Sequence, residues 1–277
     1  HFASPMWFIE GGSWFNKESS MAFANYATKM QNAFGDLVDS WNTLNEPTLL
    51  PINGYITGYF PPQRKGDFIA AIRLLNGLQR GHQTAYRRMK VEDPDSIIGV
   101  SNNTMAFNGT NLAYQPFARL YDWYLVEHGP NRFNEVDFVG LSYYGRMPSS
   151  PRPFTVTEKP AWFDKHDIPH DDLFETYPEG LPGILDRVSH RHQKPIIITE
   201  NGTCSKDDQL RIHNMRDHLE MIYQAIKRGI DIRGYFHWST FDNTELHEGP
   251  DLQFGLVNVN PDTLDRTPKP SARVYAE

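Results

Sequence analysis

The chain has little cysteine, no excess of positive charge and no long apolar run, and each shortage excludes a class of protein. Its single cysteine, Cys204, cannot form a disulfide within the chain. Lys and Arg number 27 against 34 Asp and Glu, which argues against a nucleic-acid-binding surface or a polybasic membrane patch. No stretch approaches the roughly 18 apolar residues of a membrane-spanning helix. We therefore expect a reduced, soluble, cytoplasmic globular protein that binds neither nucleic acid nor membrane.

Two further absences narrow the chemistry. The sequence contains no G-x-G-x-x-G turn, the signature of dinucleotide-binding folds. It also contains no H-E-x-x-H or other histidine pair at the spacing of a metal site. We predict neither a cofactor nor a metal site.

Apolar residues recur at two spacings that alternate along the chain. Helical spacing predicts helices over residues 19–35, 67–90, 115–128, 179–192 and 208–228. Short apolar segments between them predict strands over residues 37–44, 97–101, 136–143, 195–199 and 232–238. Alternation of this kind is typical of right-handed βαβ units with a parallel sheet, and no linker divides the chain. We expect one domain, with the Pro-rich stretch from Met147 to Phe154 as a loop.

Polar residues follow the predicted strands at their carboxyl ends. In a (β/α)8 barrel that face carries the active site, whereas a doubly wound sheet concentrates its ligand at one switch point. The strand-end residues are Asn45 and Glu46, Tyr144, Glu200, and Ser239 to Glu245.

Two of these residues are glutamates, the pair that glycoside hydrolysis requires. One carboxylic acid protonates the leaving oxygen, and a second carboxylate attacks the anomeric carbon or activates water. Glu46 lies in Thr43–Pro47 (TLNEP), and Glu200 lies in Ile198–Gly202 (ITENG). Taken singly, either could be a loop carboxylate or a salt-bridge partner. The pair at two strand ends favours catalysis.

Longer segments around both glutamates resemble motifs of the retaining β-glycosidases of glycoside hydrolase family 1. Residues 41–47 (WNTLNEP) are similar to the family's acid/base motif, and residues 197–202 (IITENG) to its nucleophile motif, in the same order and spacing. The similarity continues through residues 137–144 (DFVGLSYY), 234–243 (GYFHWSTFDN) and 266–269 (RTPK).

The resemblance implies an α/β fold, the TIM (β/α)8 barrel, of which this chain holds a part. His1 to Pro5 match the end of the family's third strand. The expectation is one partial catalytic domain, residues 1–277, from the end of strand 3 through helix 8 and without the first two βα units.

The resemblance also implies a retaining β-glycosidase, first of all a β-glucosidase, that hydrolyses terminal non-reducing β-D-glycosyl residues of a β-linked glycoside or oligosaccharide. Glu46 would be the acid/base with a raised pKa, and Glu200 the nucleophile that forms a covalent glycosyl-enzyme, their carboxyls about 5–5.5 Å apart. Asn45 would contact the sugar 2-hydroxyl, and Tyr144 would hydrogen-bond Glu200. The residues that match the family's non-reducing-sugar site are His1, Trp238 and Glu245.

Several positions depart from the family or allow a simpler interpretation. Leu246 stands where most members have Trp, Ser142 stands where most have Asn, and the stretch before Tyr144 is about 30 residues shorter than usual. Trp238 and Tyr143 could simply belong to the barrel core, an interpretation that is stronger for Tyr143 than for Trp238. His82 and His237 are predicted to be packed and Cys204 incidental, while solvated positions are predicted for His190, His192, His213 and His218.

The sequence disfavours one substrate class and leaves one main rival to the enzyme open. Glu245, Glu248 and Asp251 argue against a 6-phosphorylated substrate, because they would repel a phosphate. An inactive fragment, or a sugar-binding remnant that needs the missing amino-terminal part, is the main rival to an enzyme. The preferred sugar, the aglycone and the oligomeric state are not specified by the residues.

Overall fold

The computed structural model describes residues 1–152, 158–246 and 248–277. The chain divides into two compact units, and the division cuts through three strands. Unit 1 comprises residues 1–103, 125–141 and 192–197, and unit 2 comprises residues 104–124, 142–191 and 198–277. Each unit therefore contains its own set of strand segments with its own helices.

Five strands form one sheet in chain order, with a helical segment between each strand and the next. The first strand pairs in parallel with the second, with Trp41 opposite Ile98. This arrangement is that of successive βα units, as the alternating apolar pattern predicts. The strands are β1 (Trp41–Asn45), β2 (Ile98–Gly109), β3 (Phe138–Ser149), β4 (Ile196–Asn201) and β5 (Ile232–His237).

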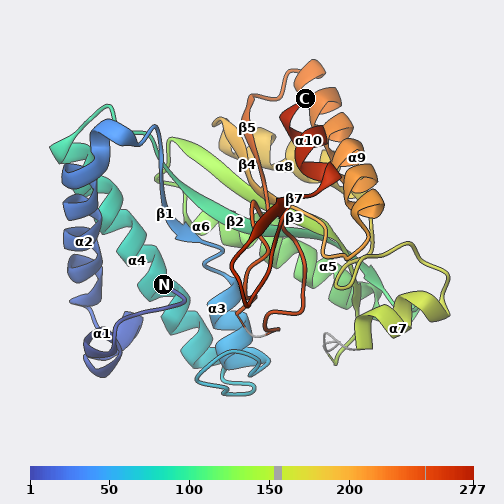
Figure 1. Cartoon of the computed structure of the whole chain (residues 1–277). Coiled ribbons are helices and arrows are strands. Elements are labelled where there is room, and N and C mark those ends of the chain that lie inside the picture. The colour runs from blue at the N-terminus through green and yellow to red at the C-terminus, as the bar shows by residue number, and fades with distance from the viewer. Residues whose placement is uncertain (153–157, 247) are drawn as a thin grey trace. The chain divides into compact units, whose positions relative to one another are not determined.

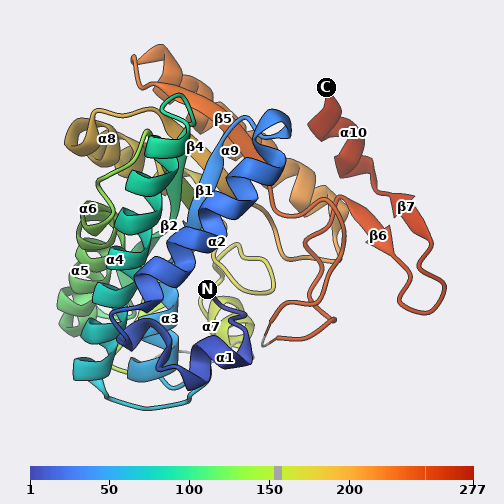
Figure 2. The same ribbon diagram turned by 90° about the vertical axis from the view of Figure 1, so that its left-hand side faces the viewer.

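Two long helices lie side by side in unit 1, as both ribbon views show (Figures 1 and 2). The longer, α4 (Phe68–Glu92), is capped by Asp67, whose side chain accepts a hydrogen bond from the Ala70 N–H. Its Gly77 allows a close approach, since a Cβ there would lie 1.9 Å from the Trp14 carbonyl oxygen. The second long helix is α2 (Ser19–Phe34). The shorter helices of this unit are α1 (Met6–Glu10), α3 (Leu49–Pro51) and α6 (Gly129–Arg132).

Unit 2 contains the remaining helices of the chain. Helix α9 (Asp208–Lys227) buries Ile212, Met215 and Ile222, and α10 (Pro270–Ala276) lies beside it (Figure 1). Burying a side chain of this size contributes about 1.5–3 kcal/mol. The remaining elements are α5 (Gln115–Asp122), α7 (Glu158–Lys165), α8 (Leu181–His192) and the antiparallel pair β6 (Val257–Val259) and β7 (Arg266–Pro268), which Figure 2 shows as a separate ribbon.

The five predicted helices and five predicted strands are confirmed, but several boundaries were wrong. β1 begins at Trp41 rather than Leu37, because residues 35–37 form a helical turn that leaves Leu37 77% exposed. β2 and β3 continue past Ser101 and Tyr143, where the Thr104 hydroxyl donates to the Ser142 carbonyl at 2.7 Å. The expected strand end at residues 1–5 is not a strand.

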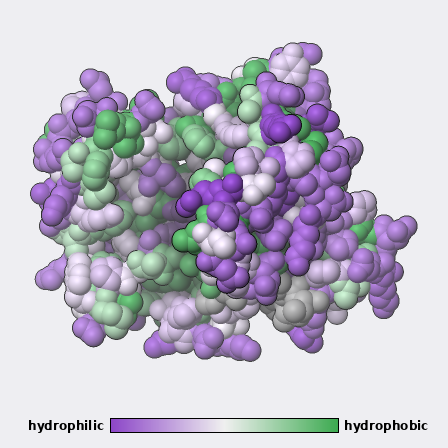
Figure 3. Space-filling view, viewed as in Figure 1, coloured by the Kyte–Doolittle hydropathy of each residue, from purple (hydrophilic) through white to green (hydrophobic). Residues whose placement is uncertain are grey.

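The Pro-rich stretch expected to be a loop is strand at its start. Met147, Pro148 and Ser149 belong to β3, while Pro153 and Phe154 lie outside the described residues. No helix in the described part of the chain combines the length and hydrophobicity that a bilayer crossing requires. Figure 3 shows apolar patches on the surface over α2, which carries the exposed side chains Met21 and Phe34.

Candidate active site

Glu46 is held at the end of β1 by its own backbone. Its N–H donates to the Ser101 carbonyl at 2.8 Å, and its carbonyl accepts from the Leu49 N–H at 3.0 Å. Its φ of 49° lies in the left-handed region, which non-glycine residues adopt rarely and often at functional positions. Glu46 is only 8% exposed. The backbone therefore fixes where this buried carboxyl begins.

A second strand supplies a partner for the Glu46 carboxyl. The amide Nδ2 of Asn103 donates to Oε1 of Glu46 at 3.1 Å. Asn103 lies on β2 and is as buried as Glu46. Asn103 was not predicted as a site residue, although Asn102 and Asn103 follow an apolar strand segment just as Asn45 and Glu46 do.

The other two expected site residues of unit 1 are Asn45 and His1. Asn45 is the half-buried last residue of β1, opposite Ser101 in the strand register. The His1 ring lies 4.2 Å from the Phe2 ring, and its Nε2 is buried with no hydrogen-bond partner in the described part of the chain. The role of His1 in sugar binding stays a prediction.

His82 supports β1 from outside the site. Its Nδ1 lies 2.8 Å from the Thr43 hydroxyl and its Nε2 lies 2.9 Å from the Glu135 carbonyl. Burial lowers the pKa of His82 to about 4, so the imidazole is neutral at pH 7. The prediction of a core histidine is confirmed. Its role is to hold the strand that leads to Glu46.

Glu200 stands near the end of β4 in unit 2, and Tyr144 holds its carboxyl. The Tyr144 hydroxyl donates to Oε2 of Glu200 at 2.8 Å. The Tyr144 ring is itself fixed, because it stacks on Phe174 at 5.5 Å and meets Phe254 edge-on at 5.9 Å. One oxygen of Glu200 thus has a donor held by packing on two sides.

The two residues after Glu200 connect neighbouring strands. The Asn201 amide donates to the Tyr143 carbonyl at 2.6 Å, and its oxygen accepts from the Tyr235 hydroxyl at 2.8 Å. Gly202 lies so close to the residue after β5 that a Cβ would be 2.0 Å from the Trp238 carbonyl oxygen. The carboxylate of Glu200 is therefore followed by an amide, Asn201, that connects two neighbouring strands, and by a position, Gly202, at which only glycine fits.

Trp238 and Glu245 form the other pair of unit 2. The indole Nε1 of Trp238 donates to Oε1 of Glu245 at 3.2 Å. The pKa of Glu245 is raised, mainly by burial and further by the negative charges of Glu248 and Glu200, while the indole opposes the shift. Trp238 also packs against the cluster of Leu173, Cys204 and Phe254. The interpretation of Trp238 as a purely core residue is therefore too simple.

Family comparison decides what these motifs belong to. The sequence profile of glycosyl hydrolase family 1 matches residues 1–111 and 132–277. The chain belongs to glycosyl hydrolase family 1. The family profile leaves residues 112–131 unmatched. These residues include α5 and lie in the stretch that was expected to be shorter than usual.

Named relatives of this family 1 chain are glycosidases. Beta-glucosidase A of Thermotoga maritima is 30% identical over 324 aligned positions that cover all of this chain and 71% of that protein. A Beta-galactosidase of Pyrococcus woesei is 28% identical, with 97% of this chain and 65% of that protein covered.

Solved structures agree with the barrel fold. The Thermotoga maritima beta-glucosidase in complex with azafagomine superimposes with a TM-score of 0.84 at 28% identity, over 100% of this chain and 71% of that one. A hyperthermophilic beta-glucosidase mutant gives 0.84 at 31% identity, over 96% of this chain and 61% of that one. The family 1 chain is therefore an incomplete (β/α)8 barrel that spans about two thirds of these relatives.

The structure places each expected site residue in one unit or the other. Unit 1 carries His1, Asn45 and Glu46, and unit 2 carries Tyr144, Glu200, Trp238 and Glu245. Within unit 2, Tyr144 donates a hydrogen bond to Glu200, and Trp238 donates one to Glu245. The separation of the two glutamate carboxyls stays a prediction.

Two departures from the family have visible surroundings. Ser142 is fully buried, and its carbonyl accepts the Thr104 hydroxyl. Leu246, where the family usually has Trp, is 69% exposed.

His218, expected to be solvated, is 1% exposed, because it faces the Tyr143 ring at 5.6 Å instead of solvent. That expectation was wrong.

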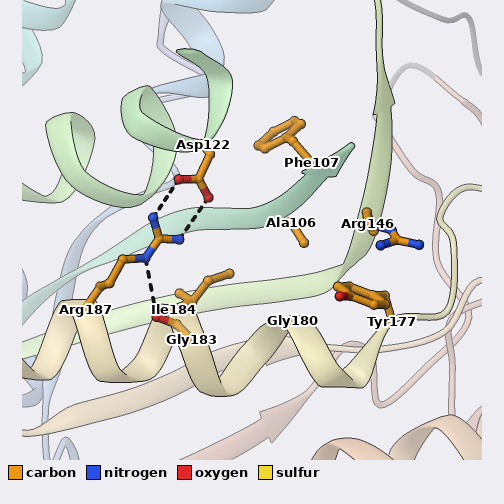
Figure 4. Close-up of a pocket in the computed structure, with 9 residues that line it drawn as sticks. All are labelled: Ala106, Phe107, Asp122, Arg146, Tyr177, Gly180, Gly183, Ile184 and Arg187. Carbon is orange, nitrogen blue, oxygen red and sulfur yellow. Dashed lines mark hydrogen bonds and ion pairs between the residues drawn. The ribbon is translucent and has the colours of Figure 1, made fainter. Parts of the chain in front are cut away.

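Unit 2 also contains a cavity of about 420 Å³ that none of the expected site residues lines (Figure 4). The charged side chains that line this cavity already form ion pairs. Arg187 donates two hydrogen bonds to the Asp122 carboxylate, and Arg146 is paired with Glu175 and lies 3.9 Å above the Tyr177 ring. These ion pairs support β3 and α8.

Proposed function

We propose that this family 1 chain carries the catalytic residues of a retaining β-glycosidase that acts on terminal non-reducing β-D-glycosyl residues, with β-glucosides as the first substrates to test. Glu200 is the nucleophile and Glu46 the acid/base. The observation that carries the proposal is the hydrogen bond from Tyr144 to Glu200, in the same unit as the Trp238–Glu245 pair.

The first half of the reaction uses both carboxyls. An oxygen of Glu200 attacks the anomeric carbon while the bond from that carbon to the leaving oxygen breaks and its electron pair stays on that oxygen. Glu46 gives its proton to the leaving oxygen, so the aglycone departs as a neutral alcohol. The Tyr144 hydroxyl holds the other Glu200 oxygen and orients the attack.

The second half returns the enzyme to its starting state. Ionised Glu46 removes a proton from water, the water oxygen attacks the anomeric carbon, and the bond to Glu200 breaks with its electrons returning to the carboxylate. Two inversions at one carbon give net retention of configuration. No cofactor takes part in this scheme.

The surroundings of Trp238 favour an uncharged sugar. The indole offers an apolar face, and Glu245 accepts hydrogen bonds from hydroxyls such as those at sugar positions 4 and 6. The negative charges of Glu248 and Glu200 act electrostatically on Glu245, so the surroundings of Glu245 are already negative. A 6-phosphate would be repelled.

The alternative is an inactive fragment or a sugar-binding remnant. In the described residues, β1 and β5 are terminal strands with one strand neighbour each. Phe236 on β5 is 59% exposed, although strand residues of this size are usually buried. The chain also covers 71% or less of the relatives and solved structures named above.

Hydrolysis of p-nitrophenyl β-glycosides, with the gluco-, galacto-, manno- and fuco- sugars compared, tests the proposal. We expect turnover by the wild-type chain, loss of about 10⁴-fold or more in Glu200→Ala, and a large loss in Glu46→Gln. Glu10→Gln, which changes an exposed carboxylate, is the matched control. The 6-phosphorylated glucoside should not be hydrolysed.

A binding measurement with azafagomine, the ligand in the Thermotoga maritima complex, distinguishes the enzyme from a sugar-binding remnant and from an inactive fragment. Turnover that disappears with Glu200→Ala supports the enzyme. Binding without turnover supports a sugar-binding remnant, and neither binding nor turnover by folded protein supports an inactive fragment.

A further inference from the structure

We propose that Asn103 is the positioning residue of the acid/base, and that its amide N–H holds Oε1 of Glu46 so that Oε2 carries the catalytic proton. The inference deepens the proposed function and rests on it for the role of Glu46. It concerns a contact within unit 1, which is present whatever the substrate.

The hydrogen bond between Asn103 and Glu46 has an ordinary length and is shielded from solvent. Asn103 Nδ2 lies 3.1 Å from Glu46 Oε1, within normal hydrogen-bond range. The two side chains come from adjacent strands that are joined by the hydrogen bond from the Glu46 N–H to the Ser101 carbonyl. Both residues are 8% exposed, so solvent competes little for either partner.

The fold itself does not require Asn103 to be an asparagine. Its neighbour Asn102 donates to the Val100 and Gly140 carbonyls and so ties β2 to β3. Asn103 has no such bond, and its Oδ1 is buried without a partner among the described residues. A buried polar atom left unpaired costs about 1–3 kcal/mol. Among the described residues, the Asn103 amide donates to Glu46, which points to a functional role.

The chemistry of an amide explains what the bond does. The NH₂ group donates and cannot accept, so the oxygen it contacts serves as the acceptor and the proton resides on the other oxygen. In the first step Oε2 gives its proton to the leaving oxygen as the bond to the anomeric carbon breaks. In the second step Oε2 takes a proton from water. Oε1 stays on Asn103 throughout, and the carboxyl cannot rotate between the two steps.

Dependence on the leaving group separates this role from a structural one. A 2,4-dinitrophenyl group leaves without protonation, whereas a p-methoxyphenyl group needs the acid. General-acid catalysis contributes about 10²–10⁴-fold, so we expect Asn103→Leu and Asn103→Ala to lose about 10- to 100-fold in kcat/KM on p-methoxyphenyl β-glucoside. On the dinitrophenyl substrate the loss should stay below about threefold. Asn108→Leu, an exposed asparagine on the same strand, should change neither.

A second measurement does not depend on turnover. In protein labelled at the glutamate carboxyl carbons, the Glu46 resonance is the one absent from Glu46→Gln. At a pH where this carboxyl is ionised, we expect its resonance to move in Asn103→Leu and Asn103→Ala and to stay in place in Asn108→Leu. The shift reports loss of the donor directly.

The outcomes are distinct. An unmoved Glu46 resonance, or equal losses on both leaving groups, overturns the role of Asn103. If the wild-type chain hydrolyses nothing while the resonance moves in both Asn103 variants, the proposed function fails and the positioning contact stands. Two variants are used because Leu can overpack the site and Ala can leave a cavity, and only the missing donor is common to both.

Discussion

Tyr144 contacts Glu200 through one hydroxyl, while its ring packs against Phe174 and Phe254. These two interactions can be separated by removing a single oxygen atom. The phenylalanine variant keeps the ring and its packing. It loses only the donor that faces the nucleophile, so catalysis and folding should respond differently.

We expect Tyr144→Phe to lower kcat by about 10- to 100-fold, which corresponds to the 1.5–3 kcal/mol of a hydrogen bond to a charged group. The melting temperature should change little. The matched control is Tyr143→Phe, because the fully buried Tyr143 hydroxyl donates to the Tyr177 carbonyl instead of to a proposed catalytic group. Steady-state kinetics and thermal unfolding of both variants check this. Equal losses of activity in the two would argue against an orienting role for Tyr144.

Asp208 joins two helices of unit 2 and also neutralises a buried cation. On α9 it accepts from Nη1 of Arg211 at 2.6 Å, and it accepts from both the N–H and the hydroxyl of Ser271 on α10, at 2.8 and 2.7 Å. Arg211 is fully buried. Loss of the carboxylate would leave a buried positive charge without its counter-ion, which is among the costliest changes in a protein interior.

We expect Asp208→Ala to lower the free energy of unfolding by about 3–5 kcal/mol. The adjacent Asp207 only caps α9 by accepting the Gln209 N–H, so Asp207→Ala should cost about 1 kcal/mol. Urea unfolding of both variants, followed by circular dichroism, measures the difference. If Asp208→Ala is no more destabilising than Asp207→Ala, the ion pair contributes nothing to the docking of α10.

The helices and strands that were predicted from sequence are those with strong apolar periodicity. The β6–β7 pair was missed because each strand has three residues and Arg266–Pro268 is entirely exposed, so no alternation is visible. Strand ends were misplaced for a related reason. Thr104 looks like the start of a loop, yet buried hydrogen bonding lets β2 continue through it.

The site was predictable where motifs carry it and not where tertiary contacts do. Glu46 and Glu200 stand in motifs that sequence reveals. Asn103 acquires its importance only because β2 pairs with β1 and brings the amide to Glu46. His218 was predicted to be solvated because a lone histidine in an amphipathic helix gives no sign of the Tyr143 ring that covers it.

Buried titratable groups give the whole chain a pH-dependent stability. Burial lowers the pKa of His82, His218 and His237 to about 4, so all three stay neutral in the folded protein between pH 6 and pH 5. In the unfolded chain they have a pKa near 6.5 and bind protons in that range. Asp171 opposes them, because burial raises its pKa to about 6. Unfolding in this range therefore takes up about three protons at the histidines and releases about one at Asp171. The net uptake is about two protons.

Stability is therefore lost as pH falls through this window. Two protons correspond to about 2.7 kcal/mol of unfolding free energy per pH unit, and we expect the urea midpoint to fall steadily from pH 6 to pH 5. His218→Gln should reduce the slope by about one proton, or 1.4 kcal/mol per pH unit. Tyr223→Phe, at an exposed position of the same helix that does not titrate in this range, should leave it unchanged. Equal slopes for the wild type and both variants would mean that the burial of His218 does not govern the acid sensitivity of the chain.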